Sequence, residues 1–177
     1  RYLVGKGIEW NNGSNLLWSL SELVIYSGHG RALDISYLNP ISSHLEIELN
    51  DRQNLLGTES GNAVWQFSLD YLMHSKIRLS GNFLIDEFIL DKIEKEQGKI
   101  NGIAFSLRGS YMISHPKFEM LAYCSFIHVG PHTFRHNGYN NFVSRNAPLG
   151  WKWGSDSEEF RVGVELFKYK KFNNAFV

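Results

Sequence analysis

The stretch 130–158 contains the side chains best suited to hold a ligand. It combines basic and amide side chains with five aromatic rings, namely Phe134, Tyr139, Phe142, Trp151 and Trp153. Rings stack on the apolar C–H faces of sugars, and a few well-placed polar groups orient the ligand. These residue types predict a glycan site formed by Arg135, Tyr139, Arg145, Trp151, Trp153 and Asp156. The alternative is that the rings only pack the loop against the rest of the protein.

Two other clusters raise the possibility of catalysis or metal binding. Asp86 and Glu87 are adjacent, and neighbouring strand residues point to opposite faces, so the two carboxyl groups cannot flank one scissile bond. His128, His132 and His136 are spaced by four residues, as on a helix face, but glycine and proline among them argue against a helix. We therefore expect no catalytic residue, no metal site and no cofactor, and hence no enzyme.

The elements that carry these residues are strands with a strict alternation of side chains. Apolar residues alternate with polar or charged ones over 63–73 and 77–85, so one side of each strand is entirely apolar. Strands are predicted over 3–10, 15–26, 63–73, 77–87, 103–113, 118–129 and 159–169. Of these, 118–129 is apolar on both faces, so its orientation stays open. No segment is typical of a long helix.

The alternation divides the predicted sheet into two faces of opposite character. One face would meet lipid through Phe67, Leu69, Leu79, Phe105, Leu107, Val162 and Val164. The other would line a polar lumen through Gln66, Asp70, Arg78, Asn82, Arg108, Arg161 and Glu165. A sheet exposed to water on one side also alternates, but a transmembrane β-barrel requires the pattern. Opposite charges on neighbouring strands are expected to compensate one another in the lumen.

The connections alternate between short and long. Three short turns, near 11–14, 74–76 and 114–117, separate long connections over 27–62, 88–102 and 130–158. Outer-membrane barrels have tight turns on one side and long loops on the other. If 32–38 and 44–49 form one extra hairpin, this parity is preserved. The sequence thus predicts an all-β, antiparallel, up-and-down transmembrane β-barrel, or a large fragment of one.

Length and charge narrow the possible functions. The 177 residues suit a single domain, and 18 basic residues balance 18 acidic ones. Because of this balance, the chain has no excess of positive charge of the kind that nucleic-acid-binding proteins use. A single cysteine excludes an internal disulfide framework, and no apolar run is long enough for a transmembrane helix. Because the chain begins with Arg1 and shows no leader, we expect a mature chain or a fragment.

Several short segments form a recognisable series along most of the chain. They are SELVIYS at 21–27, YLNPI at 37–41, NLLG at 54–57, LIDEF at 84–88, and PLG at 148–150 followed by GSDS at 154–157. In their order and rough spacing, these segments resemble the capsule assembly (Wzi-like) family of outer-membrane β-barrels. The family barrel has about twice as many strands, so the resemblance implies that residues 1–177 form the later part of one barrel domain.

The resemblance implies a non-enzymatic, lectin-like role in anchoring capsular polysaccharide or exopolysaccharide at the cell outer membrane. It makes Asn39, Asp86, Arg135, Tyr139 and Asp156 structural or glycan-facing. The expected partners are polysaccharide and outer-membrane lipid, with a larger envelope assembly as a further possibility. Two alternatives remain open at this point. One is a passive outer-membrane pore or transporter, and the other is a soluble β-sandwich enzyme that acts on carbohydrate.

Overall fold

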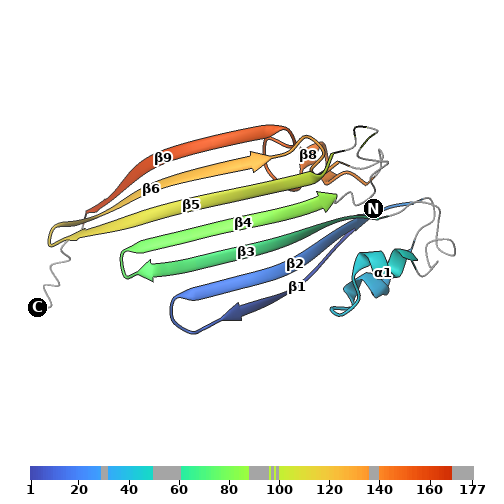
Figure 1. The fold of residues 1–177 in the computed structure, drawn as a ribbon, viewed down its shortest axis with the longest axis horizontal. Coiled ribbons are helices and arrows are strands. Elements are labelled where there is room, and N and C mark those ends of the chain that lie inside the picture. The colour runs from blue at the N-terminus through green and yellow to red at the C-terminus, as the bar shows by residue number, and fades with distance from the viewer. Residues whose placement is uncertain are drawn as a thin grey trace, which may run out of the picture.

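One antiparallel sheet of seven strands dominates the computed structural model, which describes residues 1–28, 32–49, 61–87, 100–135 and 140–168, with Glu96 and Gly98. The order of the strands in the sheet is their order in the chain (Figure 1). They are β1 (Tyr2–Asn11), β2 (Leu16–Tyr26), β3 (Asn62–His74), β4 (Ile77–Glu87), β5 (Gly102–His115), β6 (Phe118–Val129) and β9 (Ser157–Lys168). The seven long strands predicted from the alternation are confirmed.

The short turns lie at one end of the sheet and the long connections at the other (Figure 1). In the first short turn, the Asn12 side chain accepts hydrogen bonds from the backbone of Ser14, Asn15 and Leu16, at 3.0 Å each. Gly13 has a φ of 75°, which glycine adopts without strain. The local sequence thus closes the turn.

The prediction of an extra hairpin over 32–38 and 44–49 is wrong. These residues form a 3-10 helix, η1 (Ile35–Leu38), and a short α-helix, α1 (His44–Leu49). The Asp34 side chain accepts a hydrogen bond from Ser36 N at 2.9 Å and so caps η1. Tyr37 and Ile47 are buried against the sheet, and these tertiary contacts decide the local structure.

A second, small hairpin lies inside the long connection between β6 and β9. Its strands are β7 (Val143–Ser144) and β8 (Ala147–Pro148). The two residues between them, Arg145 and Asn146, have φ values of 49° and 64°. Positive φ at both central positions is typical of the tight turns that join antiparallel strands.

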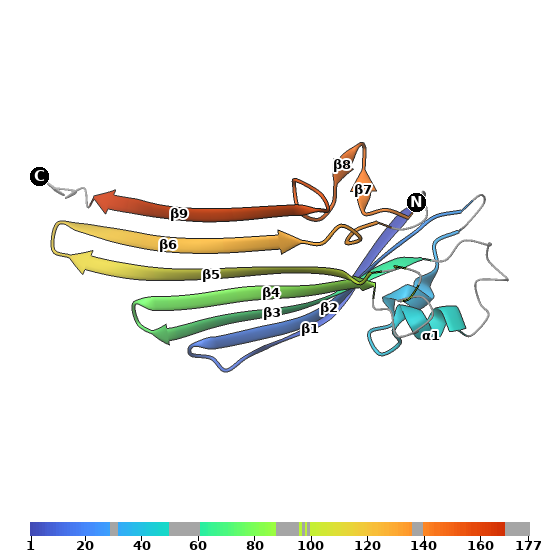
Figure 2. The ribbon, with the colours of Figure 1, turned by 45° about the horizontal axis from the view of Figure 1, so that its top comes forward.

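The two cores lie on opposite faces at the loop end of the sheet. On one face, η1 and α1 cover β1 to β3, and the core there contains Val4, Val24, Tyr26, Tyr37, Ile47 and Ala63. On the other face, Phe142 packs with Ile25 and Val64. Figure 2 shows α1 on one side of the sheet and the β7–β8 hairpin on the other.

Within the described part of the chain, most of the sheet beyond these cores is covered on neither face. The register places Phe67, Phe83 and Phe105 in one row on the apolar face, and the seven residues predicted to meet lipid share that face. The seven predicted lumen residues share the opposite face. In the described part of the chain β1 and β9 each have one neighbouring strand, so the sheet is open and closure into a barrel is not observed.

Candidate functional site

The polar face carries a continuous network of amide and hydroxyl groups across three strands. The Gln66 side chain on β3 donates to Asn82 Oδ1 on β4 at 3.0 Å, and Ser68 donates to the same oxygen at 2.7 Å. The Asn82 amide then donates to Ser106 on β5 at 3.1 Å. The alternation places all four side chains on one face, and the register aligns them.

Charged residues occupy the same face closer to the short turns. Arg78 makes a two-pronged ion pair with Asp70 across the β3–β4 hairpin, with Nε–Oδ1 and Nη2–Oδ2 distances of 2.8 Å. The Arg108 guanidinium lies 4.6 Å from the centre of the Tyr123 ring. Compensation of charge between neighbouring strands is therefore observed for Asp70 and Arg78. Glu165 lies on the same face, on β9, and is exposed.

The connection between β6 and β9 folds back over the loop end of the polar face. The Asp86 carboxylate, next to last in β4, accepts a hydrogen bond from the backbone N–H of Phe134. Thr133 Oγ1 donates to the carbonyl of Ile103 at 2.9 Å, and the Asn62 side chain donates to the carbonyl of Asn140 at 3.1 Å. These contacts fix the connection above β3 to β5.

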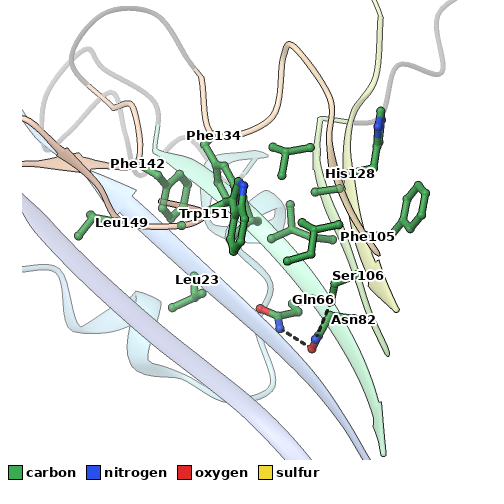
Figure 3. A pocket seen from close by; sticks show the side chains of 16 residues that line it. Leu23, Gln66, Asn82, Phe105, Ser106, His128, Phe134, Phe142, Leu149 and Trp151 are labelled. Atoms are coloured by element: carbon green, nitrogen blue, oxygen red, sulfur yellow. Dashed lines mark hydrogen bonds between the residues drawn. The ribbon is translucent and has the colours of Figure 1, made fainter. Parts of the chain in front are cut away.

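A cleft of about 410 Å³ lies between this connection and the sheet. Figure 3 shows Trp151 and Phe134 on its loop side and the Gln66–Asn82–Ser106 network on its strand side. The Phe134 ring lies directly against Gly150, where an added Cβ would come within 2.5 Å of the ring. Glycine at position 150 therefore allows the close approach of the ring.

The described lining of the cleft carries almost no ionisable side chains. None of these lining residues is Asp, Glu, Lys or Arg, and among them only His128 has a titratable side chain. The indole Nε1 of Trp151 is buried and has no hydrogen-bond partner in the described part of the chain. A buried donor without a partner costs free energy.

Trp153, two residues further along, lies in a different environment. Its ring is 65% exposed, and Lys152 Nζ lies 4.9 Å from the ring centre. Its indole nitrogen donates to Glu159 Oε2 at 3.3 Å, and Arg161 Nη2 donates to the same oxygen at 2.7 Å. Trp153 therefore belongs to an exposed, charged cluster outside the cleft.

The other predicted glycan residues lie apart from the cleft. Arg135 is exposed and donates to Ser155 Oγ at 3.0 Å, and Arg145 forms the β7–β8 turn. Asp156 has a φ of 58°, and its backbone N–H bonds to the carbonyl of Gly130 at 3.3 Å. Tyr139 lies outside the described residues. Of the predicted glycan residues that the structure describes, only Trp151 lines the cleft, together with the predicted lumen residues Gln66 and Asn82.

Sequence reasoning missed several residues of the cleft. Ser106 and Leu84 line it from the strands, and Leu149 and Gly150 line it from the loop. The alternation already places Ser106 on the same face as Asn82, so the sequence pattern could have indicated Ser106. The approach of Leu149 and Gly150 depends on how the long connection folds back, and no local pattern indicates this.

The histidines considered for metal binding are dispersed. His128 Nδ1 pairs with Glu158 Oε1 at 2.8 Å on the apolar face, while His132 follows β6 in the connection. His136 lies outside the described residues. Across the described ranges, no three His, Cys, Asp or Glu side chains gather as a metal site would require.

The fold defines an all-β protein built on one large antiparallel sheet, and the site is a cleft with an aromatic wall and an amide wall. No family model, curated protein or solved structure matches the chain. None of the helices in the described part of the chain has the length and apolar character needed to cross a bilayer.

Proposed function

We propose that this chain forms the wall of an outer-membrane β-barrel that binds polysaccharide at the cell surface without catalysing a reaction. The observation that carries the proposal is the exposed apolar face, which extends over all seven strands. Leu20, Phe67, Leu107, Phe160 and Val162 are each more than 40% exposed to solvent on this face. Soluble monomers rarely expose apolar patches of more than a few hundred Å². Lipid is the solvent that suits such a face.

The stagger of the hairpins supports the same proposal. Tyr71 on β3 pairs with the first residue of β2, and β3 continues beyond it to His74. In the same way, Tyr111 on β5 pairs with the first residue of β4, and β5 continues beyond it to His115. With strands about 4.8 Å apart and a rise of about 3.3 Å per residue, this stagger corresponds to a strand tilt of roughly 45° if the short turns lie in one plane. Transmembrane strands have tilts of this size.

The proposal requires that the outer edges of β1 and β9 be paired. Unpaired backbone N–H and C=O groups are not tolerated in the hydrocarbon core, where each costs several kcal/mol. Further strands, or the two edges themselves, would have to supply these hydrogen bonds. The polar face, with its paired Asp70 and Arg78, would then face the lumen.

Detergent dependence tests the membrane assignment directly. We expect the purified chain to aggregate in buffer and to remain dispersed, with a β-sheet circular dichroism spectrum, only in detergent or lipid. A chain that is monomeric and folded in plain buffer would contradict the proposal and favour the soluble carbohydrate-active enzyme.

The cleft supports glycan binding as the role of the loop end. An aromatic wall suits the apolar face of a sugar ring, and Gln66 and Asn82 offer amide groups to its hydroxyls. Its volume of about 410 Å³ lies within the usual range for small-ligand sites. The absence of carboxylates and basic groups from the described lining favours a neutral sugar over a charged one.

Replacement of Trp151 tests the glycan assignment. We expect Trp151→Ala to weaken binding of neutral glucose, galactose or mannose tetrasaccharides at least about ten-fold, as loss of a well-packed aromatic contact would. Titration calorimetry on the detergent-solubilised protein measures the change. Trp153→Ala is the matched control, because Trp153 lies outside the cleft, and it should bind as the unmodified chain does. Equal effects of the two substitutions would remove the cleft from the site.

A passive pore or transporter is the second candidate. It is favoured by the charged residues on the polar face, where Asp70, Arg78 and Arg108 line a second hollow of about 530 Å³ near the short turns. Against it, the β6–β9 connection covers the loop end of that face. A covered lumen suits an anchor better than an open channel.

A further inference from the structure

An ion pair lies on the apolar face, at the edge that β1 and β2 form. Lys6 Nζ is 2.8 Å from Glu22 Oε2, and only 10% and 7% of the two side chains are exposed. Glu22 Oε1 also accepts hydrogen bonds from Trp65 Nε1 at 2.7 Å and from the backbone N–H of His44 at 3.1 Å. His44 Nδ1 lies 2.7 Å from the same oxygen. The pair is therefore enclosed, on a face that is otherwise largely exposed and apolar and where another ion pair, His128–Glu158, is exposed.

Counting from the short turns places this pair at the depth of exposed apolar side chains. Glu22 lies eight residues from Ser14 in the first short turn, and Phe67 lies eight residues from Ser75 in the second. If the short turns share one membrane surface, both side chains lie at the same level. A lysine that faces lipid costs roughly 2–4 kcal/mol at the bilayer midplane and less near the interface. The Lys6–Glu22 pair must therefore be shielded.

Residues 32–49 provide this shield. Lys6 donates a hydrogen bond to the carbonyl of Ser42, and the Tyr26 hydroxyl accepts one from the backbone N–H of Asp34 at 2.9 Å. The Tyr37 ring stacks on the Tyr26 ring, with centroids 4.7 Å apart. These contacts hold η1 and α1 against the apolar face at its loop end.

The shielding segment itself exposes apolar side chains. Ile41 is 92% exposed and Ile35 is 73% exposed, while Leu33 and Leu38 are each more than half exposed. Ile41 lines one hollow together with Ile8 and Leu20, which are exposed on the apolar face of the sheet. Exposed apolar side chains of the sheet and of the segment therefore meet in this hollow.

We propose that residues 33–41 contact the membrane. In this arrangement the exposed apolar side chains of the segment insert among lipid acyl chains near the headgroup boundary on the loop side. They are Leu33, Ile35, Leu38 and Ile41. Lipid then contacts these side chains instead of the Lys6–Glu22 pair. Continuity with the apolar face of the sheet identifies lipid as the occupant. The inference rests on the proposed membrane location of the sheet.

Depth-dependent fluorescence quenching tests the inference. Cys124, the single cysteine, is exposed, and the register places it opposite Val162 on the apolar face. A bimane label on Cys124 reports the sheet. In a Cys124→Ser background, Ile41→Cys reports the segment, and Glu165→Cys reports the polar face as the control. Each labelled chain is reconstituted into phosphatidylcholine vesicles that carry a nitroxide either near the headgroup or deep in the acyl chain.

We expect the shallow nitroxide to quench position 41 at least about two-fold more than position 165, and the deep nitroxide to quench Cys124 most strongly. Quenching at Cys124 without quenching at position 41 would overturn the inference and leave the membrane location intact; a protein partner on the segment would give this result. Absence of quenching at all three positions would overturn the proposed function itself. Ile35→Cys in the same background provides a second reporter should the label at position 41 impair folding.

Discussion

Asp86 illustrates how a residue of chemical interest can have a structural role. Its carboxylate accepts a hydrogen bond from the backbone N–H of Phe134. Phe134 has a φ of 66°, a conformation that L residues rarely adopt. The contact joins the loop end of β4 to the connection that covers the polar face. Asp86 therefore positions the aromatic wall of the cleft, since Phe134 forms part of that wall.

Glu22 gives a test of the enclosed ion pair at the residue scale. Because Glu22→Gln leaves the Lys6 ammonium buried without its counter-charge, we expect a loss of about 3–5 kcal/mol in the free energy of unfolding. Urea unfolding in detergent micelles, followed by tryptophan fluorescence, measures this loss.

Glu158→Gln is the matched control for Glu22→Gln. Glu158 also pairs with a histidine on the apolar face, but its side chain is 64% exposed. An exposed pair contributes little, so the control should unfold almost as the unmodified chain does. If both substitutions had the same small effect, the contacts of Glu22 with Lys6 and His44 would not be what holds α1 against the sheet.

The residues of the site were only partly predictable from the sequence. Trp151 was identified by residue type, and Gln66 and Asn82 by their place in the alternation. Residue type alone gave no way to separate Trp151 from Trp153, because their difference comes from the fold of the connection. The partnership of Phe134 with Asp86 joins positions far apart in the chain, and no local pattern encodes it.

The elements were predicted well where they are long. The structure confirms all seven predicted long strands, each of ten or more residues in the fold, including 118–129, which is apolar on both faces. The prediction fails at 32–38 and 44–49, which also alternate. In segments this short, alternation cannot distinguish a strand from a helical turn, and burial of Tyr37 and Ile47 decides between them.

The two faces of β9 can be compared with one matched pair of substitutions. Val164 and Glu165 are adjacent, and the register places Val164 on the apolar face and Glu165 on the polar face. We expect Val164→Lys to lower the free energy of unfolding in lipid by roughly 2–4 kcal/mol, because in the proposed barrel it places a charge in the hydrocarbon.

Glu165→Lys should have little effect, because that side chain already carries a charge on the polar face. Reversible urea unfolding in phospholipid vesicles provides the comparison. Equal costs at the two positions would show that neither face meets lipid.

At the scale of the whole molecule, the loop end determines what the polar face can do. The β6–β9 connection closes over β3 to β5 through Phe142 and the contact of Phe134 with Asp86. In the proposed barrel, a lumen covered in this way should not pass ions freely. The anchor and the pore therefore differ in a property that can be measured directly.

We expect no steady conductance when the chain is reconstituted in planar lipid bilayers. Deletion of residues 141–149, which removes Phe142 and the β7–β8 hairpin, should produce open channels, because it uncovers the polar face. Stable channels in the unmodified chain would instead favour the pore or transporter.

The agreement between the order of the strands in the sheet and their order in the chain also has a consequence for folding kinetics. Each of the three short-turn hairpins brings together only residues that are close in sequence, so little chain entropy is lost before their hydrogen bonds form. Pairing of β6 with β9 is different, because the connection that carries the cleft must be enclosed at the same time. Pairing across the three long connections, of β2 with β3, of β4 with β5 and of β6 with β9, is therefore expected after the hairpins have assembled.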